Sequence, residues 1–349
     1  MLQVQDAPAR QANARQFNVA VVGATGAVGA ELIACLEARD FPVRSLKLLA
    51  SARSAGKQLA FRGRPVTVET LTADSFDDVH IAIFAAGASL SREFAPIAAA
   101  KGALVVDNSS AFRMQPETPL VVPEVNGALL ADRPRIVANP NCVAAIAVMA
   151  LNPLHARAPI RRVIGATYQA ASGAGAAAMA ELEQSTAAYL AGEAYEPKVL
   201  PHPYAFNLFS HNAGVDPESG YNGEELKAME EIRKIMDLPD LRLSFTCVRV
   251  PVLRAHSMAL TVEFDRPVAP ADAEAWLKTA RGVRLVNDVE RNHFPMPNEA
   301  SGQDDVLVGR IRTDASDPSG CTLSIFVAGD QLLKGAALNA VQIAEVLAR

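Results

Sequence analysis

One cysteine stands where a nucleophile would be expected. Asn139-Pro140-Asn141-Cys142 comes directly before the apolar run VAAIAVMAL at 143–151, which predicts a helix. A thiol at a helix N-terminus meets the positive end of the helix dipole and unpaired backbone N–H groups, which lower its pKa. We therefore predict that Cys142 is a reactive thiolate able to form covalent acyl intermediates.

The other three cysteines are predicted to be structural. Cys35 lies in a helical pattern, and Cys247 and Cys321 lie in strand-like runs, where free cysteines are usually small buried hydrophobes. The four cysteines have neither the spacing of a zinc site nor the density of a disulfide scaffold. We expect no metal and a reducing cytoplasm.

Three glycines form a candidate phosphate-binding turn. Gly23, Gly26 and Gly29 follow the β-rich segment FNVAVV at 17–22 and precede a helical pattern at 30–39. In this context glycines let backbone N–H groups and the helix N-terminus approach a pyrophosphate. The alternative is a tight turn without a ligand, but the strand and helix context favours dinucleotide binding.

The segment after the second predicted strand indicates which dinucleotide is bound. NAD-specific enzymes carry an acid there to hold the ribose hydroxyls, whereas this chain has Arg53 between Ala52 and Ser54. A cation beside hydroxyl groups favours the 2′-phosphate of NADP(H). The alternative is an ordinary solvent-exposed arginine.

A cysteine mechanism also needs a proton carrier. His256 follows the strand-like run that carries Arg249, but a lone histidine is more often structural than catalytic. Chain position alone does not choose between it and the others: His80, His155, His202, His211 and His293.

The elements that must position these residues alternate between strand and helix. Strand-like runs are separated by helical stretches such as 91–102, which predicts a parallel sheet with crossover helices. The runs in the first part of the chain are 17–22, 46–51, 66–71, 80–86 and 103–110.

The pattern changes after about residue 140. Longer strands at 162–172 and 243–252, with helices at 174–191 and 223–236, predict a second α/β domain. The apolar spacing of 331–349 predicts a helix that packs back on the first domain. We therefore expect a Rossmann-type domain of residues 17–139 plus 330–349 and a catalytic domain of residues 140–329.

Composition points to a small-molecule partner. The chain has 349 residues, 50% of them hydrophobic, and a net charge of -5. It has no basic run for nucleic acid or an anionic membrane, and no apolar stretch of the ~18 residues that a membrane span needs. Residues 1–16 are polar and are predicted to form a flexible tail.

The motifs together resemble those of aspartate-β-semialdehyde dehydrogenase along residues 17–349. No single motif suffices, but their order and spacing are specific. They are GATGAVG (23–29), DNSSAFR (107–113), VVPEVN (121–126), ANPNC (138–142), TYQAASGAG (167–175), YAFNLFSHN (204–212), YNGEELK (221–227), RVPVLRAHS (249–257), VGRIR (308–312) and GDQLLKGAALNAVQIAE (329–345).

The resemblance implies a fold like that of glyceraldehyde-3-phosphate dehydrogenase and a role for each matching residue. Cys142 would be the nucleophile, His256 the general acid/base, and Gln169 would orient thiol and substrate. Arg249 would clamp the substrate α-carboxylate as a planar bidentate donor, and Glu224 would receive the α-ammonium. The phosphate group would be bound by Arg113, Lys227 and Asn141.

These roles have plainer alternatives. Glu224 and Lys227 are three residues apart on a predicted helix, a spacing typical of surface ion pairs. Arg113 follows a Ser-Ser turn and, without the resemblance, would be read as a solvated loop residue.

The resemblance also implies cofactor contacts and a homodimer formed through the second domain. The cofactor would contact the glycine turn, the Arg53 segment, the nicotinamide side of the site and the C-terminal helix. The residues are Gly23, Thr25, Gly26, Ala27, Val28, Arg53, Ser54, Ser172, Gly173 and Gln331.

Two departures from the family pattern lie close to the chemistry. Val143-Ala144 follow the nucleophile where the family usually has Ser-Thr, and Met258 stands where it usually has Glu. Because a carboxylate beside the histidine would orient its ring, we expect reduced rather than absent activity.

The predicted reaction is the reversible, NADPH-dependent reductive dephosphorylation of L-4-aspartyl phosphate to L-aspartate 4-semialdehyde, in the synthesis of the aspartate-derived amino acids. Its partners are then a small substrate and phosphate. Two alternatives stay open: a related acyl-phosphate reductase, which should lack Glu224, and a non-catalytic NADP-binding paralogue.

Overall fold

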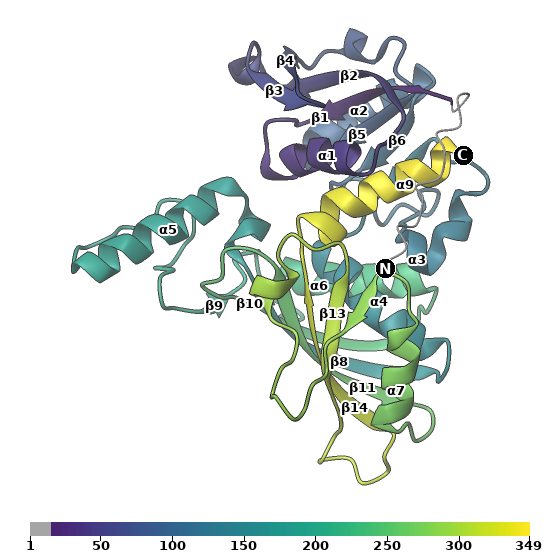
Figure 1. The fold of residues 1–349 in the computed structure, drawn as a ribbon, viewed down its shortest axis with the longest axis vertical. Helices are drawn as coiled ribbons and strands as arrows, with labels where there is room; N and C mark the ends of the chain where they lie inside the picture. Colours follow the sequence, from purple (N-terminus) through teal and green to yellow (C-terminus); the bar gives the residue numbers. More distant parts are fainter. Residues whose placement is uncertain (1–14) are drawn as a thin grey trace, which may run out of the picture.

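Two seven-stranded sheets form the body of the protein (Figure 1). The computed structural model describes residues 15–349, so the predicted tail at 1–16 lies almost wholly outside the described residues. None of the described helices is long and apolar enough to span a bilayer.

The first sheet has the strand order β3-β4-β2-β1-β5-β6-β7, and all its neighbours are parallel except the β3-β4 hairpin. Its central strands are buried on both faces, as crossover helices require. The strands are β1 (Phe17–Val22), β2 (Val43–Ala50), β3 (Gln58–Phe61), β4 (Arg64–Thr70), β5 (Ile81–Phe84), β6 (Leu104–Asp107) and β7 (Ile136–Ala138). The helices among them are α1 (Ala27–Ala38), α2 (Ala88–Ala100) and α3 (Pro123–Asn126).

The second sheet is mixed, with the order β12-β13-β14-β11-β8-β10-β9. Its strands are β8 (Ile160–Gln169), β9 (Phe209–Ser210), β10 (Arg242–Arg249), β11 (His256–Phe264), β12 (Val283–Leu285), β13 (Val306–Thr313) and β14 (Thr322–Gly329). Its helices are α4 (Cys142–His155), α5 (Ala176–Ala191), α6 (Gly223–Met236), α7 (Pro270–Lys278) and α8 (Pro297–Ala300). The predicted α/β class, with a Rossmann-type sheet and a second α/β domain, is confirmed.

Helix α4 joins the two sheets. Ten of its 14 residues are buried, and a helix that is apolar all round must be enclosed by other elements. It shares one hydrophobic core with residues of the first sheet, such as Val22 and Phe84, and of the second, such as Val327. The nucleophile at its first position is therefore held where the sheets meet.

The chain returns to the first sheet at its end. Helix α9 (Leu338–Ala348) packs against α1 and β6 (Figure 1) and contributes to the core on that face of the first sheet. The sequence predicted one continuous helix, but a π-helical turn (Leu333–Ala337) precedes α9. The strands of each sheet fall inside the predicted domain bounds, 17–139 plus 330–349 and 140–329, a division that we keep as a proposal.

Candidate active site

The glycine turn has the geometry of a phosphate cradle. Gly23 has φ +81°, and a Cβ there would lie 2.4 Å from the carbonyl oxygen of Ala85. A Cβ on Gly29 would lie 2.2 Å from the carbonyl oxygen of Gly23, so neither glycine tolerates a side chain. Helix α1 begins after Gly26 without a side-chain cap, and its first N–H groups are free for an anion. The residues present fit a dinucleotide pyrophosphate.

The Arg53 segment lies at the carboxyl end of β2. It forms a single 3₁₀ turn (Ala52–Ser54) in which Arg53 is exposed. The hydroxyl of Thr25 donates to Ser54 Oγ at 3.4 Å, which ties this segment to the glycine turn. A guanidinium beside hydroxyl groups at this edge suits a 2′-phosphate.

Cys142 is the first residue of α4, as the sequence predicted. Its helix is capped by Asn141, whose Oδ1 accepts the N–H of Val143 at 2.9 Å. A Cβ on Gly335 would lie 2.8 Å from Cys142 Cβ, so the π-helical turn can pass the nucleophile only as glycine. Cys142 lines a cavity of about 160 Å³ that reaches from Val28 to Arg113. The other lining residues include Asn141, Ser172, Gly173, Gln331 and Gly335.

The prediction of a lowered thiol pKa for Cys142 is wrong. Burial raises the pKa of Cys142 to about 12, and the nearby charge of Glu224 raises it further. Arg249, Arg113 and the N–H of Val143 lower it without offsetting the burial. The resting nucleophile is therefore a thiol, because desolvation outweighs the helix N-terminus.

His256 is fully buried at the start of β11. Its Nδ1 accepts the N–H of Ala170 at 3.0 Å, which places the ring proton on Nε2. Nε2 has no hydrogen-bond partner among the described residues, and Gly173 packs so closely that a Cβ there would lie 3.0 Å from it. Burial, with help from Arg249 and His211, lowers the pKa of His256 well below its ordinary value. The neutral ring thus offers an unused donor beside Gly173.

The two residues predicted to hold the substrate's amino-acid head are both buried. Arg249 donates from Nη1 to the carbonyl oxygen of Ala170 at 3.1 Å, and its Nη2 lies 2.8 Å from His211 Nε2. Glu224 Oε1 accepts from Asn141 Nδ2 at 3.0 Å and from Gln169 Nε2 at 3.2 Å. Glu224 is therefore a buried partner of Asn141 and Gln169 rather than a member of a surface ion pair with Lys227.

Gln169 and Lys227 occupy supporting positions. Gln169 is buried and accepts the hydroxyl of Thr167 at 3.1 Å, so its amide orients Glu224. Lys227 is half-buried, and its charge lowers the pKa values of both Glu224 and His211. Lys227, which the resemblance places at the phosphate, thus lies near Glu224 and His211.

Arg113 is a buried residue, not a solvated one, and its partner was not predicted. It donates from Nη1 to Glu231 Oε1 at 3.1 Å, from Nε to the carbonyl oxygen of Asn139 and from Nη2 to that of Asn108. Glu231 Oε2 also accepts the N–H of Asn141 at 2.5 Å. One carboxylate thus holds both the cavity's guanidinium and the residue before the nucleophile. The only sequence signal was its spacing, seven residues after Glu224 and so on the same helix face.

Gln331 ties together two segments predicted to lie beside the nicotinamide. Its Oε1 accepts the N–H of Ala255 at 2.9 Å, and its Nε2 donates to Ser172 Oγ. The predicted cofactor residues Ser172, Gly173 and Gln331 therefore lie together along the cavity of Cys142.

The remaining sequence features lie outside the site or in its core. Burial raises the pKa of Cys35 and of Cys247 to about 12, as expected of buried structural thiols. Cys321 is half-buried, so the prediction of burial is wrong for it because β14 begins only at the next residue. Val143 and Met258 are fully buried in the hydrophobic core, and the N–H of Ala170 provides the contact that orients His256.

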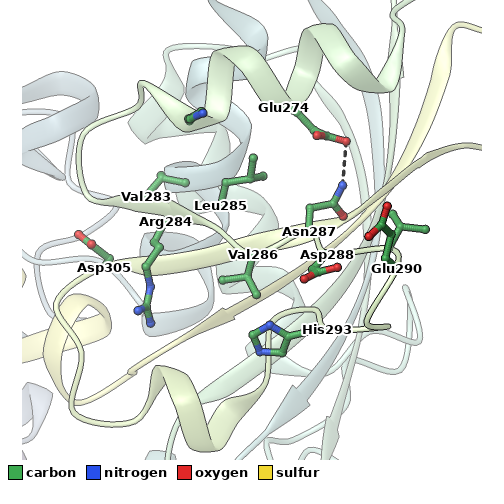
Figure 2. A pocket seen from close by; sticks show the side chains of 12 residues that line it. Glu274, Val283, Arg284, Leu285, Val286, Asn287, Asp288, Glu290, His293 and Asp305 are labelled. Carbon is green, nitrogen blue, oxygen red and sulfur yellow. Dashed lines mark hydrogen bonds between the residues drawn. The ribbon is translucent and has the colours of Figure 1, made fainter.

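A larger groove of about 910 Å³ lies away from this chemistry (Figure 2). It is formed by α7, β12 and the following loop, where Asn287 donates to Glu274. Within residues 15–349, no three His, Cys, Asp or Glu side chains form a group that could hold a metal ion.

The fold and site together define a class: dinucleotide-dependent dehydrogenases with a cysteine nucleophile. Residues 18–133 match the family model "Semialdehyde dehydrogenase, NAD binding domain", and residues 151–334 match "Semialdehyde dehydrogenase, dimerisation domain". Among curated relatives, the aspartate-semialdehyde dehydrogenase of Synechocystis sp. is 50% identical and covers 95% of this chain and 97% of its own length. That of Bacillus subtilis is 46% identical and covers 95% and 98%. The chain belongs to the aspartate-semialdehyde dehydrogenase family.

Solved structures place the chain in the same family. Aspartate semialdehyde dehydrogenase II from Vibrio cholerae, in complex with ASA, is 42% identical and superposes with a TM-score of 0.91 over 95% of this chain and 98% of that one. The resemblance predicted from the sequence motifs is confirmed.

Proposed function

We propose that the protein is an NADPH-dependent enzyme that converts L-4-aspartyl phosphate and NADPH to L-aspartate 4-semialdehyde, NADP and phosphate, reversibly. The observation that carries this proposal is the cavity that Cys142 and Arg113 line together and that Val28, next to the glycine turn, closes on the other side. Neither a non-catalytic paralogue nor another acyl-phosphate reductase gains support from the relatives, and Glu224, which the latter should lack, is present.

The cofactor would reach this cavity only with its nicotinamide end, because Ser172 and Gly173 line the cavity whereas the glycine turn and Arg53 lie outside it. Gly23, Gly26 and the N-terminus of α1 would hold its pyrophosphate, Arg53 its 2′-phosphate, and Ser172 and Gly173 its nicotinamide end. Bound there, NADPH supplies the hydride.

Cys142 performs the covalent step. Its sulfur attacks the acyl carbon, the bond to phosphate breaks, and the thiol proton leaves with the phosphate, which gives an enzyme thioester. Reduced by that hydride, the thioester would become a thiohemiacetal oxyanion. Collapse of the oxyanion breaks the C–S bond and releases the aldehyde, and the Cys142 thiolate then takes a proton from solvent. His256 was predicted to be the general acid/base, but its Nδ1 is occupied by the N–H of Ala170 and its Nε2 carries the proton, so the neutral ring cannot take the thiol proton. It supports both steps instead because its Nε2–H donates to the acyl oxygen where negative charge develops.

Arg249 and Glu224 recognise the amino-acid head of the substrate. Arg249 binds the α-carboxylate and Glu224 the α-ammonium. Arg113 binds the phosphate group with the N–H groups that are not used by Glu231, Asn139 and Asn108. Asn141 assists at the phosphate, Lys227 assists at the amino-acid head near Glu224, and Gln169 positions Glu224.

The direct test is phosphate-dependent reduction of NADP by L-aspartate 4-semialdehyde, followed by the absorbance of NADPH. Turnover that requires all three reactants supports the proposal. An intact protein that binds NADP but gives no turnover contradicts it.

Replacing Arg53 with alanine should raise the KM for NADP by about tenfold or more and leave the KM for NAD unchanged, because one charge-assisted contact to the 2′-phosphate is lost. Steady-state kinetics with each dinucleotide checks this. Arg44→Ala is the matched control, since Arg44 is an exposed arginine at the other end of the same strand. Equal effects on NADP and NAD would show that Arg53 does not read the 2′-phosphate.

Replacing Glu231 with glutamine should raise the KM for phosphate about tenfold in semialdehyde oxidation and lower the melting temperature, because it leaves the buried Arg113 without its counter-charge. The control is Glu230→Gln, the exposed neighbour on the same helix. A wild-type KM for phosphate in Glu231→Gln would rule out this positioning role.

We further propose that the protein acts as a cytoplasmic homodimer through the second sheet. The dimerisation-domain match supports this, as does the sheet face on which Ile164 (45% exposed) and Tyr168 (37%) carry accessible apolar surface. Tyr168 lies beside Phe326 of β14, with ring centroids 6.1 Å apart. The free thiols of Cys35, Cys142, Cys247 and Cys321 suit a reducing compartment.

A further inference from the structure

His211 is a half-buried histidine that no sequence motif assigned to a role. Strand β9 pairs antiparallel with β10, and the N–H of His211 donates to the carbonyl oxygen of Cys247 at 2.8 Å. This anchor sets the imidazole against Arg249 of β10, with His211 Nε2 only 2.8 Å from Arg249 Nη2. The ring is therefore part of the surroundings of the substrate-binding guanidinium.

The two ring nitrogens of His211 both face N–H donors. The N–H of Ala213 points at Nδ1 at 3.1 Å, and Arg249 Nη2 faces Nε2. A neutral imidazole has one N–H and one free lone pair, so it can accept only one of these two bonds. If Nδ1 carries the proton, it faces the N–H of Ala213, and if Nε2 carries the proton, it faces an N–H of Arg249. In either case two donors face each other. A buried contact of this kind lacks an acceptor.

The ring is neutral at ordinary pH. Burial lowers the pKa of His211 to about 4, and the charges of Arg249 and Lys227 lower it as well, against the opposing effect of Glu224. A protonated ring would add a second conflict, since both nitrogens would then be donors. The missing partner is thus an acceptor, and it must come from outside the described residues.

We propose that His211 is a specificity-determining residue whose Nε2–H, together with an N–H of Arg249 Nη2, binds the α-carboxylate of the substrate. In this arrangement Nδ1 keeps its bond from Ala213, and a carboxylate oxygen takes the two N–H groups that otherwise face each other. This inference rests on the proposed function, because it concerns how the same site reads its substrate.

The neighbouring charges select an α-amino acid rather than another anion. Glu224 lies close enough to act on the pKa of His211, and its carboxylate repels a dianion but attracts an ammonium group. The guanidinium of Arg249 lies directly against Gly173 at the edge of the cavity, since a Cβ on Gly173 would lie 3.0 Å from Arg249 Nη1. An α-amino acid matches this arrangement, because its carboxylate can accept from His211 and Arg249 while its ammonium group donates to Glu224.

The test compares two variants of His211. His211→Leu removes the donor and keeps most of the volume, whereas His211→Gln keeps an N–H at nearly the same reach. We expect His211→Leu to raise the KM for L-aspartate 4-semialdehyde about tenfold or more, with unchanged KM values for NADP and phosphate, and His211→Gln to recover most of this loss. With 3-aminopropanal, which lacks the carboxylate, wild type and His211→Leu should have equal kcat/KM.

A binding measurement separates this inference from the proposed reaction. L-2-aminobutyrate keeps both charged groups but has no aldehyde, and ligand-observed NMR reports its binding without turnover. We expect binding by wild type and by His211→Gln and at least tenfold weaker binding by His211→Leu. Equal binding by all three, or an equal loss of kcat/KM for 3-aminopropanal in His211→Leu, would overturn the inference whether or not the wild type is active.

Discussion

Cys142→Ala should lower kcat by ~10⁴-fold or more while binding of NADP stays at its wild-type strength. No other described side chain in the cavity can form the thioester, so loss of the sulfur removes the covalent route rather than weakening it. Kinetics of semialdehyde oxidation together with NADP binding by fluorescence checks both halves. Alanine should also pack well at position 142, because it retains the Cβ that lies against Gly335.

The matched control is Cys321→Ala, a half-buried cysteine outside the site, which should retain wild-type turnover. If Cys142→Ala kept more than a few per cent of the activity, the nucleophile would have to be another group.

The raised pKa of Cys142 adds a pH signature to this prediction. Because the folded thiol titrates near pH 12, its thiolate fraction should rise about tenfold per pH unit through the neutral range, and so should the rate of alkylation by iodoacetamide. An alkylation rate that levels off near pH 8 in the unliganded protein would contradict a burial-raised pKa. Saturating phosphate and NADP should change the pH dependence of alkylation only if their binding alters the surroundings of the Cys142 sulfur.

Arg249→Leu should lower kcat/KM for L-aspartate 4-semialdehyde by about 10²- to 10³-fold, because it removes the charge-assisted bonds to the α-carboxylate. Most of the change should appear in KM. Loss of the bond to the carbonyl oxygen of Ala170 should also lower kcat, since the N–H of that residue orients His256.

Two variants make this result specific. Arg249→Lys keeps the charge but not the planar fork, and should recover only part of the affinity. Arg242→Leu removes an exposed arginine at the other end of β10 and should leave kcat/KM near wild type. Equal losses in Arg242→Leu and Arg249→Leu would point to damage of the strand rather than to a lost substrate contact.

The sequence predicted the parts of the site that depend on local chain geometry. The glycine turn and the position of Cys142 follow from a strand, a turn and a helix that are adjacent in sequence, and the structure contains both. The motif resemblance added Arg249, Glu224 and His256, which lie on three different elements of the second domain. Their convergence depends on how that domain packs, which periodicity alone does not reveal.

What the sequence did not predict depends on contacts between distant residues. Glu231 is 118 positions from Arg113 in the chain, and His211 is 38 from Arg249, so no local pattern pairs them. The raised pKa of Cys142 has the same origin: the helix N-terminus is visible in the sequence, whereas the enclosure by the π-helical turn is not.

The return of α9 to the first sheet bears on how the chain is made. Six residues of α9, from Leu338 to Leu347, belong to the hydrophobic core on that face of the first sheet. This core is therefore incomplete until α9 has been synthesised. During translation this face of the first sheet keeps apolar surface uncovered until then. We expect removal of residues 338–349 to give insoluble protein, although no catalytic side chain would be lost.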